Sequence, residues 1–238
     1  MLINSTTHKA YNYLLDLIFP VLCVECGHEG TYLCPKCLTR VAALTMEQLC
    51  PACAKPSPFG KTHPQCESQT SLSGFIHALR YKDSTVRRLV ELFKYHGIKD
   101  IGALAGGIMS QEIQNQSLEN YFQAFVIVPI PLHPKRLKWR GYNQSDLMGQ
   151  AIANKFGWAI NNKLLIKAKH STAQAKLNKK QRQENLVDAF DAPSDCTNLK
   201  ILIIDDVATT RATLNQAANV LKKARAKEVW ALTLAYED

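Results

Sequence analysis

Two adjacent carboxylates at the end of a strongly apolar segment are the first residues whose types and spacing could do chemistry. Residues 201–214 read ILIIDDVATTRATL, so the apolar run meets Asp205 and Asp206 and then a threonine-rich turn. In open α/β sheets, ligands bind in the crevice beyond the carboxyl ends of the strands. Free N–H groups at a helix start bind phosphate, and threonine hydroxyls add donors. Carboxylates beside them suit sugar hydroxyls or a divalent cation, so the stretch predicts a sugar-phosphate site.

The cysteines form a second group with chemical potential. Seven of the eight lie between Cys23 and Cys66, in the stretches CVECGHEGTYLCPKC and CPACAKPSPFGKTHPQC. Ligands separated by two residues aim at one point, and two such knuckles complete a tetrahedral zinc site. The pattern looks like a double zinc ribbon with one or two structural Zn²⁺ ions; an exchanged pairing of knuckles and the filling of the second site stay open. The expected ligand sets are Cys23, Cys26, Cys34 and Cys37, then Cys50, Cys53, His63 and Cys66.

Charge and hydropathy limit the classes of partner and location. The chain has 238 residues and a formal net charge of +9, which favours phosphate-bearing partners. No run approaches the roughly 20 apolar residues that a membrane helix needs. The N-terminal segment LLDLIFPVLC carries Asp16 and lacks a small-residue cleavage site, so we interpret it as the end of a short amphipathic helix. We expect a cytoplasmic protein with no membrane insertion.

Two parts must position these residues. Residues 1–70 are expected to form an N-terminal helix and the double zinc ribbon. In residues 71–238, strands are expected at 74–81, 124–131, 201–206 and 228–236, and helical segments at 83–97, 101–114, 144–157 and 213–226. Strands that alternate with helices predict an α/β domain with a mostly parallel sheet.

The acidic pair and its turn resemble the 5-phosphoribosyl-1-pyrophosphate (PRPP) motif of type I phosphoribosyltransferases. The resemblance implies that Asp205 and Asp206, as catalytic residues, hold the ribose hydroxyls and that the threonine turn cradles the 5-phosphate. It also implies that Mg²⁺ accompanies PRPP. The family usually has glycine where this chain has Arg211, whose guanidinium is expected either to point outwards or to add charge beside the phosphate. The implied PRPP-binding residues are Asp205, Asp206, Val207, Ala208, Thr209, Thr210, Arg211, Ala212 and Thr213.

Two other polar segments fit the same resemblance. In phosphoribosyltransferases a loop after a buried strand meets the pyrophosphate, and at that place this chain has KRLKWRG, residues 135–141. The alternatives are a solvated basic loop, or a patch that tracks a nucleic-acid backbone while Trp139 stacks on a base, and the pyrophosphate and nucleic-acid roles are compatible with each other. The polar segment 169–190 lies where the family has a flexible loop over the active site. The alternative is that it forms an ordinary surface loop. The implied pyrophosphate-loop residues are Lys135, Arg136, Lys138, Arg140 and Gly141.

The combination of motifs resembles the ComF (ComFC-type) family of competence proteins. The motifs are the N-terminal knuckles, KYHG at 94–97, PIPLHPKRLKWRGYNQ at 129–144, the spaced residues Thr172, Gln174, Leu177, Arg182, Asn185 and Phe190, and DDVATTRAT at 205–213. The resemblance implies a role in natural transformation, in which the protein handles imported single-stranded DNA beside the competence machinery, such as the import helicase. The candidate nucleic-acid-binding residues are Lys135, Arg136, Lys138, Trp139, Lys179 and Lys180.

Two functional hypotheses follow from these patterns. In one, the domain is a binding module that recognises PRPP without turnover. In the other, it is an active phosphoribosyltransferase that moves phosphoribose from PRPP to an acceptor by positioning and electrostatic stabilisation. The sequence identifies no acceptor pocket, which favours the binding module.

Overall fold

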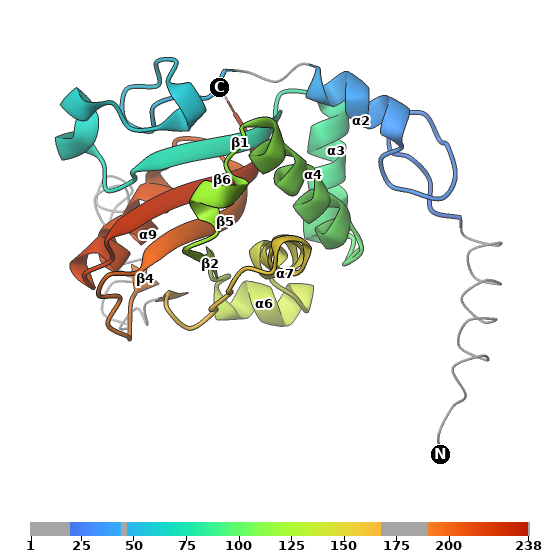
Figure 1. Cartoon of the computed structure of the whole chain (residues 1–238). Helices are drawn as coiled ribbons and strands as arrows, with labels where there is room; N and C mark the ends of the chain where they lie inside the picture. The colour runs from blue at the N-terminus through green and yellow to red at the C-terminus, as the bar shows by residue number, and fades with distance from the viewer. Residues whose placement is uncertain (1–19, 44–46, 168–189, 238) are drawn as a thin grey trace, which may run out of the picture.

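The main sheet confirms the expected α/β class. The structure is a computed structural model that describes residues 20–43, 47–167 and 190–237 (Figure 1). Among these, a four-stranded sheet has the order β1-β6-β5-β2, and every neighbouring pair is parallel. The strands are β1 (Gly74–Arg80), β2 (Phe125–Pro129), β5 (Lys200–Ala208) and β6 (Glu228–Tyr236).

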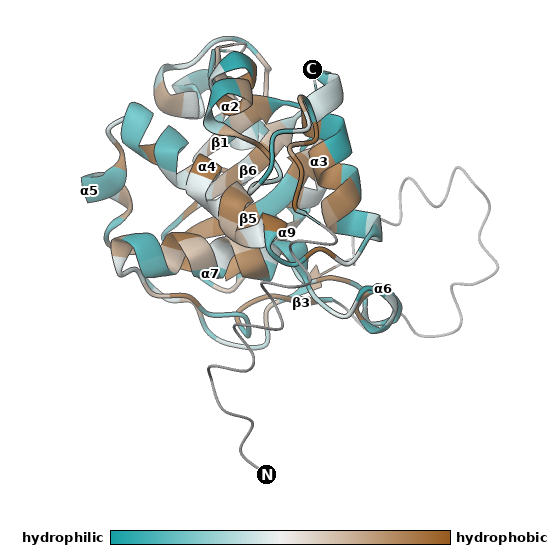
Figure 2. Cartoon of the chain, turned by 90° about the vertical axis from the view of Figure 1, so that its right-hand side faces the viewer, coloured by the Kyte–Doolittle hydropathy of each residue, from teal (hydrophilic) through white to brown (hydrophobic). Residues whose placement is uncertain are grey.

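Helices cover both faces of this sheet. One face packs against α3 (Ser84–Tyr95), α4 (Ile101–Asn115) and α7 (Gln144–Phe156), which gather on one side in Figure 1. The other face packs against α9 (Ala212–Lys223), whose buried stripe of Leu214, Ala217, Ala218 and Leu221 is the one its spacing predicts. In β5, Leu202 and Ile204 face α3, α4 and α7, whereas Ile201 and Ile203 face α9. Figure 2 shows hydrophobic residues along β5, α4 and α7 and hydrophilic ones on α5 (Glu119–Phe122).

Two elements differ from the expectation at places that matter for the site. Strand β5 continues past the aspartates, because Val207 and Ala208 still pair with Ala235 and Tyr236 of β6. The expected basic loop contains a short helix, α6 (Pro134–Arg140). Pro134 occupies its first turn, the His133 ring accepts a hydrogen bond from the backbone N–H of Lys135, and Gly141 ends it with a φ of 80°. Short strands β3 (Ile166–Lys167) and β4 (Phe190–Asp191) pair antiparallel nearby.

The cysteine-rich segments pack directly onto the α/β part. Cys23, Cys34, Cys37 and Val41, the last two in α2 (Pro35–Ala42), share a hydrophobic cluster with β1 and α3. Leu49 and Leu72, which flank the second segment with its 3-10 helices η1 (Pro58–Gly60) and η2 (Pro64–Gln69), share the cluster of α9. The two segments therefore cover opposite faces of the sheet beside β1.

No helix within the described residues is both long enough and apolar enough to cross a membrane.

Candidate functional site

The parallel strands bring some of the predicted polar residues together in one open pocket. A cavity of about 670 Å³ lies at the carboxyl ends of β2 and β5. The acidic pair lies on one wall and the start of α6 on another. Its lining includes Lys94, Tyr95, His133, Lys135, Arg136, Arg140, Asn143, Gln144, Ser145, Lys167, Asp205, Asp206 and Thr213.

The two aspartates have different surroundings. Asp205 accepts hydrogen bonds at Oδ1 from the Ser145 hydroxyl (3.1 Å) and from the backbone N–H of Asp206 (2.9 Å). Asp206 is buried, and its Oδ1 lies 2.9 Å from Nζ of Lys94 in α3. The ion pair neutralises one carboxylate, so Asp205 carries the less compensated charge in the pocket.

The basic segment divides into two sets of side chains. Lys135, Arg136 and Arg140 line the pocket, as expected for an anion-binding wall. Lys138 and Trp139 are exposed and are not part of the lining. The Trp139 ring instead lies beside the exposed ring of Tyr95, with centroids 6.3 Å apart, and the Arg140 guanidinium lies 5.8 Å from the centre of the Tyr95 ring.

The threonine turn contributes less side-chain lining than its composition predicts. Thr213, in the first turn of α9, lines the pocket, whereas Thr209 and Thr210 are exposed outside it. Ala212 lies at the helix start, where backbone N–H groups lack intrahelical acceptors. Arg211 has a φ of 59°, so this position does use the left-handed conformation that glycine adopts more easily.

Several lining residues escaped assignment from the sequence. Lys94 lies in the KYHG motif, but helical periodicity gives no reason to place it against Asp206. Ser145 had a usable signal, because Asn143 caps α7 at the end of the polar segment that follows the buried strand β2, and ligand-binding residues gather beyond the carboxyl ends of such strands. Lys167 follows a stretch of sequence with no helical or strand periodicity, so no sequence pattern placed it at the site. Its Nζ lies 3.9 Å from the centre of the Phe190 ring. Residues 169–189, including Lys179 and Lys180, lie outside the described residues.

The pKa of Asp205 is raised to about 7, first by burial and then by the charge of Asp206. In the unfolded chain it titrates near 4, so its effect on stability is most favourable below pH 4 and is lost as the pH rises towards 7. Asp205→Asn keeps an acceptor for the Ser145 hydroxyl and removes the loss of stability that ionisation of the buried carboxyl causes.

We therefore expect Asp205→Asn to stabilise the protein by about 1–2 kcal/mol at about pH 8 and by less at about pH 5.5. Thermal unfolding of both proteins at the two pH values checks this. A stability difference between the two proteins that is the same at both pH values would contradict the raised pKa of Asp205.

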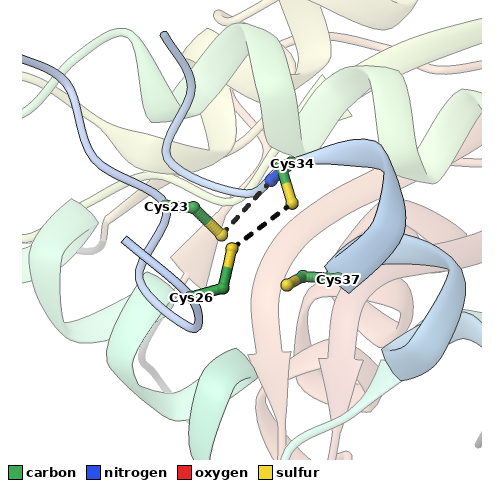
Figure 3. A group of neighbouring side chains, drawn as sticks. All are labelled: Cys23, Cys26, Cys34 and Cys37. Atoms are coloured by element: carbon green, nitrogen blue, oxygen red, sulfur yellow. Dashed lines mark hydrogen bonds between the residues drawn. The ribbon is translucent and has the colours of Figure 1, made fainter. Parts of the chain in front are cut away.

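The first metal cluster comprises Cys23, Cys26, Cys34 and Cys37, whose sulfur atoms all lie within 4.8 Å of one another (Figure 3). Gly27, with a φ of 73°, lets the chain turn back under the first pair, and its N–H donates to the Cys23 carbonyl (2.9 Å). Burial alone would raise the pKa of Cys23, but backbone N–H groups outweigh it and lower the pKa to about 6. Four sulfur ligands gathered at this spacing fit a structural Zn²⁺ ion, which binds cysteines as thiolates.

The second metal cluster comprises Cys50, Cys53, His63 and Cys66, with ligand atoms again within 4.8 Å of one another. The Cys53 sulfur lies 3.4 Å from Nδ1 of His63, so Nδ1 faces the metal position. The structure thus pairs the knuckles as the sequence predicted. Three thiolates and one imidazole also fit Zn²⁺ with no ligand position left open.

The fold and the clusters define a class, an α/β protein with an N-terminal double zinc ribbon. Residues 14–67 match the family model of the double zinc ribbon domain. The chain is 27% identical over 215 residues to the DNA utilization protein YhgH of Salmonella typhimurium, covering 89% of this chain and 88% of that protein.

Competence proteins match as well. The chain is 34% identical over 114 residues to competence protein F of Haemophilus influenzae, covering 46% of this chain and 50% of that protein. It is 26% identical over 211 residues to competence protein ComFC of Bacillus subtilis, covering 84% of this chain and 82% of that protein. The resemblance to the ComF (ComFC-type) proteins is thereby confirmed.

Solved phosphoribosyltransferases are among the structural matches. A hypoxanthine phosphoribosyltransferase from Staphylococcus aureus is 13% identical and covers 56% of this chain and 64% of that one, with a TM-score of 0.34.

Proposed function

We propose that this chain is a cytoplasmic competence protein that binds PRPP with Mg²⁺ and handles imported single-stranded DNA. The observation that carries the PRPP assignment is the pocket itself. It joins Asp205 and Asp206 to a wall of lysine and arginine side chains. The names of the relatives, competence protein and DNA utilization protein, support the cellular role.

The charges of the pocket match the parts of PRPP. Asp205 is hydrogen-bonded but carries no direct ion pair among the described residues, so its second oxygen is suited to accept from a ribose hydroxyl. Lys135, Arg136 and Arg140 suit the pyrophosphate, which brings Mg²⁺ with it. The start of α9 with Thr213 suits the 5-phosphate.

Calorimetric titration of the zinc-loaded full chain with PRPP in the presence of Mg²⁺ tests this proposal. We expect saturable binding at about micromolar strength, which needs Mg²⁺. Absence of binding would overturn the PRPP assignment.

A second candidate function is phosphoribosyl transfer. Tyr95 lines the pocket and is exposed, which leaves an aromatic face where an acceptor could rest. The acceptor would displace pyrophosphate at the anomeric carbon of the bound PRPP. Release of pyrophosphate that depends on an added acceptor would support turnover, and PRPP that binds without release would favour the binding module.

The exposed rings of Trp139 and Tyr95 suit nucleobases of a single strand. Lys138, on the same helix and outside the pocket, suits its phosphates. In this proposal Lys135 and Arg136, which line the pocket and lie in the same helix as Lys138, contribute charge to both ligands. In this proposal the partner machinery, such as the import helicase, delivers the strand to this face.

We expect Lys138→Ala with Trp139→Ala to weaken single-stranded DNA binding by about tenfold or more, because one stacked base contributes about 1–3 kcal/mol. The salt dependence should also become shallower. PRPP binding should persist, since neither residue lines the pocket.

Fluorescence anisotropy of a labelled oligonucleotide at several salt concentrations measures the effect. Leu137→Ala is the matched control, since it removes an exposed apolar side chain from the same helix. Equal losses of affinity for single-stranded DNA in the double variant and in Leu137→Ala would contradict a stacking role for Trp139.

A further inference from the structure

The side chain of Arg211 reaches the second metal cluster instead of the pocket. Its Nη1 donates to the backbone carbonyl of Cys50 at 3.3 Å, and its guanidinium carbon lies 5.1 Å from the centre of the Tyr236 ring. Arg211 is absent from the pocket lining. The guanidinium thus takes neither of the two orientations expected from the sequence: it lies outside the pocket, but it packs against the second cluster and Tyr236 and does not point outwards.

This contact holds Arg211 in an unfavourable backbone conformation. Its φ of 59° and ψ of 3° are left-handed, which costs a non-glycine residue roughly 1–2 kcal/mol. Arg211 is the residue at which the chain turns from the threonine segment into α9. The direction in which the first N–H groups of α9 point therefore depends on what fixes Arg211.

The Cys50 carbonyl is itself held by the second cluster. It accepts the backbone N–H of Ala54 at 3.1 Å, and the Cys50 N–H donates to the Lys55 carbonyl at 2.9 Å. These bonds close the knuckle that aims the sulfur atoms of Cys50 and Cys53 at the metal position. A metal bound there would keep the carbonyl in place for Arg211.

A second attachment lies one helical turn further along α9. Oδ1 of Asn215 accepts from the Thr70 hydroxyl and from the backbone N–H of Ser71, each at 2.8 Å. Thr70 and Ser71 directly follow η2, which contains Cys66. Both halves of the second cluster are thus bonded to the start of α9.

We propose that the second zinc ribbon is a metal-dependent support of the phosphate-binding turn. Through Arg211 and Asn215, the metal-loaded cluster holds residues 209–213 in the conformation that binds the 5-phosphate, and loss of this metal releases the turn. The first cluster is bonded elsewhere: Arg40 of α2 contacts Asp83 and Thr85 at the far end of α3. This inference rests on the proposed PRPP site.

Paired ligand variants test the proposal in the full chain. Cys53→Ser removes a ligand of the second cluster, and Cys26→Ser is the matched control, because each residue closes a knuckle and is less buried than the cysteine that opens that knuckle. We expect Cys53→Ser to weaken PRPP binding by about tenfold or more. Cys26→Ser should change it by no more than about twofold.

Hydrogen exchange of the amides of residues 208–215 gives a readout that needs no PRPP. We expect faster exchange there after loss of zinc from the second cluster and wild-type exchange in Cys26→Ser. In the Arg211→Gly background, Cys53→Ser should accelerate this amide exchange by less than it does in the wild-type background. The reason is that the link between Arg211 and the Cys50 carbonyl is already lost. Unchanged exchange after measured loss of that zinc would overturn the proposal.

The readouts separate this inference from the proposed function. If wild-type protein does not bind PRPP but its turn loosens on zinc loss, the PRPP site fails and the metal-dependent support stands. If wild-type protein binds PRPP and Cys53→Ser leaves both affinity and exchange unchanged, only this inference fails. Should Cys53→Ser not fold, a zinc-selective chelator applied to Cys26→Ser, in which the first cluster already lacks a ligand, and subsequent reloading with zinc give the same comparison.

Discussion

Asp205→Asn combined with Asp206→Asn is expected to abolish PRPP binding while the protein stays folded. Two charge-assisted hydrogen bonds to ribose hydroxyls contribute about 1.5–3 kcal/mol each, so affinity should fall by about 100-fold or more. The remaining Asn oxygens accept hydrogen bonds, but they lack the charge and offer one acceptor fewer.

Stability should change little, because two effects oppose each other. The double variant removes the repulsion that raises the pKa of Asp205, which stabilises the folded state near neutral pH. It also removes the ion pair between Asp206 and Lys94, which leaves the lysine without its carboxylate. Calorimetric titration and thermal unfolding of the same preparation measure both properties. Unchanged PRPP affinity would contradict the assignment of the acidic pair.

Cys23→Ser is expected to lower the zinc content by one ion per chain and to destabilise more than the ribbon itself. The Cys23 side chain is only 3% exposed and belongs to the hydrophobic cluster shared with β1 and α3. A hydroxyl is a poor replacement for a zinc thiolate, and structural zinc contributes about 10–16 kcal/mol in isolated zinc peptides. Even a fraction of this exceeds the effect of most single substitutions.

The destabilisation should reach the α/β part through α2. Arg40 donates to Asp83 at 3.1 Å and to the Thr85 hydroxyl at 2.8 Å, and Val41 is fully enclosed. Elemental analysis and thermal unfolding measure the effect. Cys196→Ser is the control, since Cys196 is equally buried but lies outside both clusters. A variant with wild-type zinc content and stability would contradict a structural role for the first cluster.

The sequence by itself determined the elements and the short-range sites. Alternation of apolar segments and amphipathic stripes predicted β6 and the buried stripe of α9, because these patterns follow from the geometry of each element. The cysteine knuckles predicted both metal clusters, since the ligands within each pair are three residues apart and their geometry is local. The predicted division at residue 70 stays a prediction, although the ribbons and the α/β part share hydrophobic clusters.

Only the tertiary structure decided which of the predicted polar residues meet. Lys94 pairs with Asp206 across 112 positions in sequence, and nothing in the periodicity of α3 indicates this contact. The basic segment forms a helix, so Lys135 and Arg136 face the pocket while Lys138 and Trp139 do not. The Arg211 side chain contacts the second metal cluster, which lies more than 140 positions away in sequence, and no local pattern around the threonine turn indicates this contact. Long-range contacts depend on how strands and helices assemble, and local residue patterns do not contain that information.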